Sequence, residues 1–306
     1  YDLTSQDDAI VLSQVLGAFG SLSMYRGRLT EALSYQQRAY HFVEKTNHPS
    51  ALNGNLTQLG LIAFQQGKPS DALDYFERVL DKNLDRENIH YQILDLRNIG
   101  AAYLAVFAYE KAIATFESAQ ELEDYIHHKD ALLQAYRALA LIEVGRIEEG
   151  IGEMQDAVRR GHKDSYHNLQ TQLLQIEAWV KVKQYEDASD TVSNFLDSTR
   201  DVNPLLYGRG LLWQGQICQT TDPSRAKKAL DQALLHESEY AGLYVWMCHY
   251  ALAQATVDAT LRRQKLNDAF QVLSAISLSL SSRPDIQQSF KKSDIFRQIE
   301  QMIEPV

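Results

Sequence analysis

The chain has 306 residues, a formal net charge of −10 and 45% apolar residues, with few Gly or Pro. This composition is typical of a soluble globular protein and excludes a disordered or fibrous one. It contains no basic stripe and no long uncharged apolar run. Both absences argue against binding to a nucleic acid backbone and against a membrane span.

The two cysteines and the first residues bear on the cellular compartment. Cys218 and Cys248 lie in apolar helical patterns, which favours buried thiols in a reducing compartment. No signal or transit peptide pattern opens the chain, so we expect a cytoplasmic location. The first residue is Tyr1 rather than Met, which suggests a part of a longer protein.

A two-part pattern recurs along the chain with a period of 38 to 40 residues. Helix ends, here called anchors, lie 40, 40, 38, 38 and 38 residues apart by subtraction, and a small residue follows each anchor five positions later. The anchors are Gly27, Gly67, Phe107, Gly145, Lys183 and Thr221, and the small residues are Ala32, Ala72, Ala112, Gly150, Ala188 and Ala226. A fixed period in this range predicts stacked helical hairpins.

The first six units each predict one hairpin. The first covers 13–44, and the second pairs a helix at 51–66 with a helix that starts near Pro69. Apolar residues at spacings of three and four continue through the third to sixth units, and no alternating strand pattern interrupts them. We therefore expect an all-α fold.

The C-terminal part of the pattern is less regular. A seventh hairpin is predicted from helices at 240–258 and 265–280, joined by a long connector at 259–264. Two short amphipathic segments follow Pro284 and are expected to cap the last hairpin. The predicted organisation is a solenoid over residues 1–283 and a capping segment over 284–306.

The anchors differ in their chemistry. Glycine ends a helix cheaply because it adopts the left-handed backbone conformation. Phe107 and Lys183 occupy the same place without being small. We therefore expect the turn to close differently at these two anchors.

The small residues resemble those of the tetratricopeptide repeat. The triplets Gly20/Ala32/Ala39, Gly60/Ala72/Val79 and Gly100/Ala112/Ala119 share gaps of 12 and 7, and Tyr103 and Phe116 stand at the family's aromatic places. The resemblance covers nearly the whole chain, although the period exceeds the family's usual length of about 34 residues. It implies a right-handed superhelix of about seven hairpins with a capping helix at the C-terminus.

The resemblance also implies which residues face inward. In this family the first helix of each hairpin lines the concave face, where peptides bind. We carry over eight polar or aromatic candidates for ligand binding: Tyr25, Gln65, Arg97, Asn98, Glu143, Glu177, Lys181 and Gln219. The carboxylate clamp of chaperone-binding members is not expected, because Gly17 and Thr57 stand where further clamp residues belong.

Several of these residues also have simpler explanations. Arg97 can be solvated or paired locally, and Glu177 and Lys181 are four apart, as in an intrahelical ion pair. Trp179, Trp213 and Trp246 are better explained by core packing than by a ligand cage. The pair His127–His128 points in two directions on a helix and does not predict a metal site.

No catalytic motif is present, and we expect no enzyme activity, metal or cofactor. The last segment, from Leu280, resembles the end of repeat regions in bacterial multidomain signalling proteins. The sequence therefore favours a sensor or scaffold region of such a protein, with a protein segment, a peptide or a small effector bound on the concave face. The alternative is a free-standing adaptor that bridges two proteins without switching.

Overall fold

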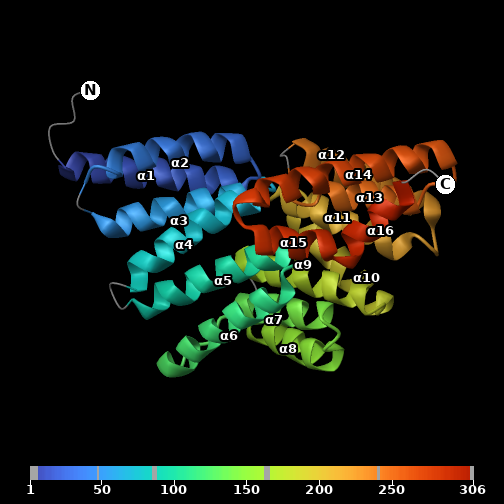
Figure 1. Ribbon diagram of the computed structural model, residues 1–306, viewed down its shortest axis with the longest axis horizontal. Coiled ribbons are helices and arrows are strands. Elements are labelled where there is room, and N and C mark those ends of the chain that lie inside the picture. Colours follow the sequence, from blue (N-terminus) through green and yellow to red (C-terminus); the bar gives the residue numbers. More distant parts are fainter. Residues whose placement is uncertain (1–5, 47, 85–87, 162–165, 240–241, 304–306) are drawn as a thin grey trace.

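The computed structural model describes residues 6–46, 48–84, 88–161, 166–239 and 242–303. All regular structure in this part of the chain is helical, as seven antiparallel hairpins followed by two short helices (Figure 1). No helix among these residues is long and apolar enough to cross a membrane. The hairpins are α1 (Gln6–Tyr25) with α2 (Leu29–Val43), α3 (Pro49–Gln65) with α4 (Pro69–Leu84), α5 (Ile89–Ala105) with α6 (Tyr109–Ile126), α7 (Ala131–Glu143) with α8 (Ile147–Arg160), α9 (Tyr166–Lys181) with α10 (Tyr185–Thr199), α11 (Pro204–Cys218) with α12 (Pro223–Glu239), and α13 (Val245–Gln254) with α14 (Ala259–Ser279). The 3-10 turn η1 (Leu280–Ser282), α15 (Pro284–Lys292) and α16 (Asp294–Ile303) complete the chain.

The turn inside each of the first five hairpins has one geometry. The anchor has a positive φ, between 59° and 84°, whether it is glycine or not. Its N–H donates to the carbonyl three residues back, and the next N–H donates to the carbonyl five residues back. This pair of bonds is the Schellman ending of a helix. The expectation that Phe107 and Lys183 close the turn differently is therefore wrong, because both residues accept the left-handed conformation.

The sixth anchor does depart from this geometry. Thr221 is not among the residues with positive φ, and the N–H of Asp222 donates to the carbonyl of Cys218, four residues back. The left-handed turn is absent here, but the period is kept because Pro223 starts α12 two residues after the anchor.

The small residue after each anchor lets the two helices of a hairpin approach closely. Ala32, Ala72, Ala112, Ala188 and Ala226 are all fully buried. The glycines of the preceding helices serve the same contact. A Cβ added to Gly60 would lie 2.5 Å from the ring of Phe76, and one added to Gly100 would lie 2.3 Å from the ring of Phe116. Both rings are buried and have no room to move.

Buried polar side chains connect the early hairpins. Asn53 donates to the side chain of Asn83 at 3.1 Å, and Asn83 donates to Asp95 at 2.6 Å, which links α3, α4 and α5. Asn55 likewise donates to Ser13 of α1 at 2.9 Å. Burial raises the pKa of Asp95 to about 7 despite the bond from Asn83.

The seventh hairpin differs from its sequence-based prediction. Within the described residues α13 begins only at Val245 and ends at Gln254, while residues 240–241 lie outside them. The connector predicted at 259–264 is helical, because Asp258 caps α14 by accepting from the N–H of Leu261 at 2.9 Å. α14 therefore begins six residues earlier than expected.

The superhelix closes on itself, so that its last helices pack against its second and third hairpins (Figure 1). The N–H of Leu243 donates to the carbonyl of Gln65 at 3.1 Å. Arg283 pairs with Asp74 and Glu77 of α4, each at 2.6 Å. One buried apolar cluster spans this contact and includes Phe76, Ile99, Val106, Trp246, Leu273, Ile286 and Phe290.

Phe107 explains how an anchor can keep a large side chain. Its ring stacks on Phe290 of α15, with 5.0 Å between ring centroids, and meets Trp246 edge-on at 5.8 Å. These aromatic contacts offset the strain of the left-handed backbone. The two C-terminal helices therefore cover the last hairpin and also hold the third hairpin.

We predict opposite effects for two glycine substitutions in α3. Gly60→Ala should lower the free energy of unfolding by about 1–3 kcal/mol, because its methyl group overlaps the buried ring of Phe76. Gly54→Ala should raise it by roughly 0.5–1 kcal/mol, since nothing lies within 4 Å of the new Cβ and alanine favours the helix. Urea denaturation followed by circular dichroism measures both. A neutral Gly60→Ala variant would contradict the close approach of α3 and α4.

The two non-glycine anchors give a second pair of variants. Lys183 is exposed, so Lys183→Gly should stabilise the fold by roughly 1 kcal/mol through relief of the left-handed strain. Phe107→Gly relieves the same strain but removes the contacts with Phe290 and Trp246, and should destabilise by about 2–4 kcal/mol. Melting temperatures of the two variants must shift in opposite directions. A shift of the same sign would mean that the aromatic contacts of Phe107 contribute little.

Candidate functional site

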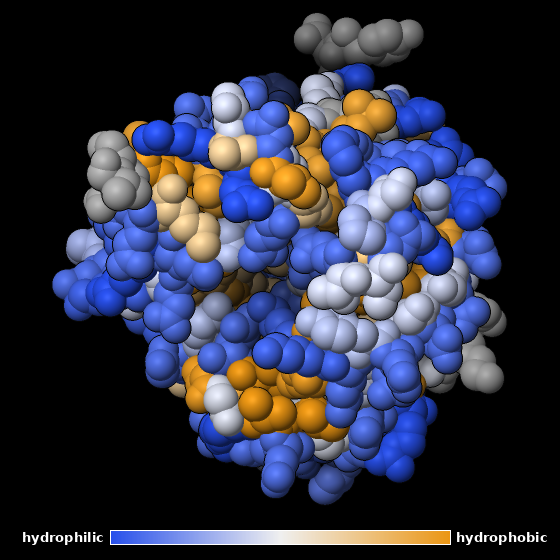
Figure 2. Space-filling view, turned by 90° about the vertical axis from the view of Figure 1, so that its right-hand side faces the viewer, coloured by the Kyte–Doolittle hydropathy of each residue, from blue (hydrophilic) through white to orange (hydrophobic). Residues whose placement is uncertain are grey.

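The first helices of the hairpins surround the interior of the superhelix. A central cavity of about 550 Å³ lies between α3, α5, α7, α9, α11 and α13, with Ser293, Asp294, Ile295 and Gln298 at one side. A side cavity of about 270 Å³ adjoins it between α1, α3, α5, α7 and α9. The two share Phe64, Gln65, Ala101, Tyr136 and Gln170. The end of the superhelix that faces the viewer in Figure 2 is hollowed near its centre, with mostly hydrophilic residues around the hollow.

All eight candidate residues line these cavities. Glu143, Glu177, Lys181 and Gln219 lie on the central cavity, and Tyr25, Arg97 and Asn98 lie on the side cavity. Gln65 lies on both. The inward register that the family resemblance implied is therefore present, and the role of these residues in binding belongs to the proposal below.

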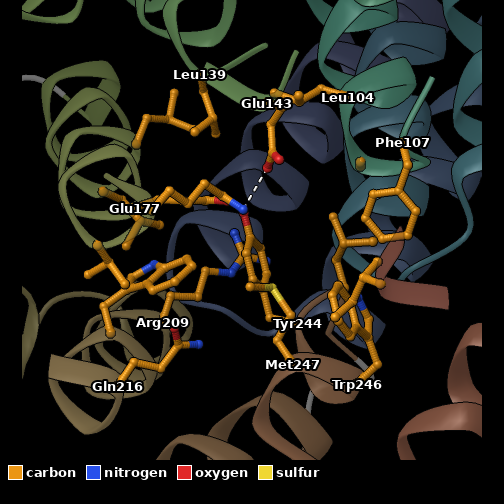
Figure 3. A pocket seen from close by; sticks show the side chains of 18 of the residues that line it. Leu104, Phe107, Leu139, Glu143, Glu177, Arg209, Gln216, Tyr244, Trp246 and Met247 are labelled. Atoms are coloured by element: carbon orange, nitrogen blue, oxygen red, sulfur yellow. Dashed lines mark ion pairs between the residues drawn. The ribbon is translucent and has the colours of Figure 1, made fainter. Parts of the chain in front are cut away.

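Lys181 joins two helices at the central cavity. Its Nζ lies 2.5 Å from an oxygen of Glu143 in α7 and 3.9 Å from an oxygen of Glu177 in its own helix. The dashed line in Figure 3 marks the pair with Glu143, and Tyr244 points toward the same part of the cavity. The simple intrahelical pair expected between Glu177 and Lys181 is therefore the weaker of the two contacts.

The surroundings of Glu177 disfavour the charged form of its side chain. Its side chain is 11% exposed, and this burial raises its pKa to about 7. Lys181 lowers that pKa, while the nearby carboxylate of Glu143 raises it. A carboxyl group of this kind takes up or releases a proton near neutral pH when its surroundings change.

Sequence reasoning missed Arg209, which lies in α11 between two glycines. Its side chain is 5% exposed and pairs with the fully buried Glu237, with 3.2 Å between Nε and the carboxylate oxygen. It also donates to the side chain of Gln65 at 2.6 Å, and its guanidinium lies 4.5 Å from the ring centroid of Tyr244. One arginine thus ties together α3, α11, α12 and the start of α13. The sequence feature that could have identified Arg209 is its charge on an otherwise apolar helix face, since a buried charge is normally paired.

The side cavity contains a structural ion pair. Arg97 is buried and its Nη1 lies 2.6 Å from Asp130, which caps α7 by accepting from the N–H groups of Leu132 and Leu133. Arg97 also lowers the pKa of Asp130 against the effect of burial. Local pairing, one of the two explanations left open, is therefore what the structure shows. A charge reversal at Arg97 would place two carboxylates together and would test stability rather than ligand binding.

The three tryptophans have different surroundings. Trp179 belongs to the apolar core around α7 and α8, as expected. Trp213 and Trp246 also line the central cavity, so core packing alone does not describe them. The indole Nε1 of Trp213 is buried and has no hydrogen-bond partner among the described residues.

Within the described ranges, no group of three or more His, Cys, Asp or Glu side chains could hold a metal ion. Cys218 and Cys248 are unpaired, and burial raises the pKa of the Cys248 thiol. His127 caps α6 in the left-handed conformation.

Comparison with known proteins rests on structure. No family model matches the chain, and no curated protein matches it. A Rap protein complexed with Competence and Sporulation Factor is similar over 98% of this chain and 78% of its own, with a TM-score of 0.55 and 14% identity. Cut9, from the APC/C hetero-tetramer Cut9–Hcn1, is similar over 97% of this chain and 59% of its own, with a TM-score of 0.59 and 12% identity.

A tetratricopeptide repeat protein from Parabacteroides merdae is similar over 92% of this chain and 98% of its own, with a TM-score of 0.44 and 14% identity. At these identities the likeness concerns the fold alone. The likeness to the Rap and Cut9 structures, together with the repeated hairpins, identifies the fold of this chain as an all-α superhelix of the tetratricopeptide-repeat type.

Proposed function

We propose that this chain is a binding module that holds a peptide segment or a small effector inside its superhelix. The observation that carries the proposal is the central cavity of about 550 Å³, which six first helices and α16 surround. A volume of this size suits a short peptide stretch or a small molecule. Apolar and aromatic walls with a few buried charges are typical of such sites.

We further propose that the chain is the sensor region of a larger bacterial signalling protein with a cytoplasmic location. Contacts between distant hairpins, such as Arg283 with Glu77 and Leu243 with Gln65, define the width of the interior. A ligand that favours one width over another would shift the population of superhelix states. The Rap structure is a complex with Competence and Sporulation Factor, which supports ligand binding by a superhelix of this kind.

A free-standing adaptor is the second candidate, and a surface on α1 favours it. Val11, Val15, Phe19 and Leu22 are between 43% and 57% exposed, and they form one stripe at spacings of four, four and three. Forty residues later, Leu59 and Ile62 occupy the register of Phe19 and Leu22 and are buried. The stripe is therefore of the kind that packs on another helix, as an adaptor requires.

Filling the cavity tests the first proposal. Ala105 lines the central cavity, so Ala105→Trp should block it and reduce the retention of a mixed pool of acetylated, amidated tetrapeptides by about tenfold. Affinity selection with mass spectrometry measures the retained peptides. Ala114→Trp is the matched control, since Ala114 is exposed on the next helix.

The control should retain the pool as the original chain does. Equal retention by Ala105→Trp would place binding elsewhere and contradict the proposal. Retention that instead falls when Phe19 is changed to Glu would favour the adaptor surface of α1.

A further inference from the structure

We infer that the central cavity selects a ligand with a basic side chain, a guanidinium or an ammonium group, placed beside Glu177 and Glu143. This inference rests on the proposed function and adds the chemical class of the ligand. The expected partner is a peptide that carries arginine or lysine between apolar residues.

The charges of the cavity do not balance. Its lining carries the acids Glu143, Glu177 and Asp294 and the bases Lys181 and Arg209. Arg209 is already neutralised by Glu237, and Lys181 can neutralise only one of the two glutamates that it contacts. The surplus is therefore acidic, and Glu177 is the more buried and the less closely paired of the two glutamates.

A carboxylate that is buried without a full partner is unfavourable, and a ligand cation relieves it. Figure 3 shows the side chains of Phe107, Tyr244 and Trp246 on the cavity. Aromatic faces attract ammonium and guanidinium groups and pack on their aliphatic stems. The same walls would disfavour an acidic ligand, because it would add to the negative surplus.

Binding of a cation should also release a proton. Glu177 faces Glu143 of α7, Lys181 of α9, Arg209 of α11, Tyr109 of α6 and Tyr244 before α13. Its pKa in this structure is about 7, so it is partly protonated at neutral pH. A ligand cation favours the ionised form, and affinity should therefore rise between about pH 6 and 8.

The test uses four pools of acetylated, amidated tetrapeptides that differ only at one fixed position: arginine, lysine, glutamate or citrulline. Citrulline has nearly the shape of arginine without its charge. The original chain should retain the arginine and lysine pools about tenfold more than the citrulline pool, and the glutamate pool least. Glu177→Gln should reduce the preference for arginine over citrulline to about threefold or less and abolish its rise with pH.

Glu186→Gln is the matched control, because Glu186 is exposed on α10 and lies outside the cavity lining. It should keep both the preference and the pH dependence, and circular dichroism checks that each variant is folded. Pools that are retained without any preference for arginine or lysine would overturn this inference while leaving cavity binding intact. Retention of no pool by the original chain would overturn the proposed function together with it.

Discussion

The close approach of the two helices in each hairpin is the constraint on which the rest of the structure depends. In the first five hairpins a left-handed residue follows the first helix, and a buried small residue comes five positions later. The turn directs the chain back, and the small side chain lets the helix backbones come together. Because the same geometry recurs, the same face of each first helix points inward. The cavities are a consequence of this repetition.

Closure of the superhelix converts an open groove into a bounded interior. The C-terminal helices α15 and α16 pack on α14 and also contact the second and third hairpins through Phe290, Arg283 and their neighbours. Phe107 is central to this contact, since one residue serves as a left-handed anchor and as an aromatic partner of α15. The strain at the anchor and the packing of the last helices are thereby coupled.

The buried charges divide into structural and available groups. Arg97 with Asp130 joins the third and fourth hairpins, and Arg209 with Glu237 joins the two helices of the sixth hairpin. Both arginines are paired within the fold. Glu177 is different, because its neighbour Lys181 lies closer to Glu143. This unequal sharing makes Glu177 the group most open to a new partner.

The sequence by itself determined the helical hairpins and their period, since these follow from local spacing and from small residues at fixed intervals, and the family resemblance implied which residues face inward. It misjudged the connector at 259–264, where the cap at Asp258 extends α14, and it could not identify the role of Arg209. Only the tertiary structure decided which charges meet. Residues such as Gln65 and Arg209 are 144 positions apart, and Glu77 and Arg283 are 206 apart. Each hairpin is rotated slightly relative to the one before it, and the total rotation over several hairpins brings these residues together. A local sequence pattern does not predict that total rotation.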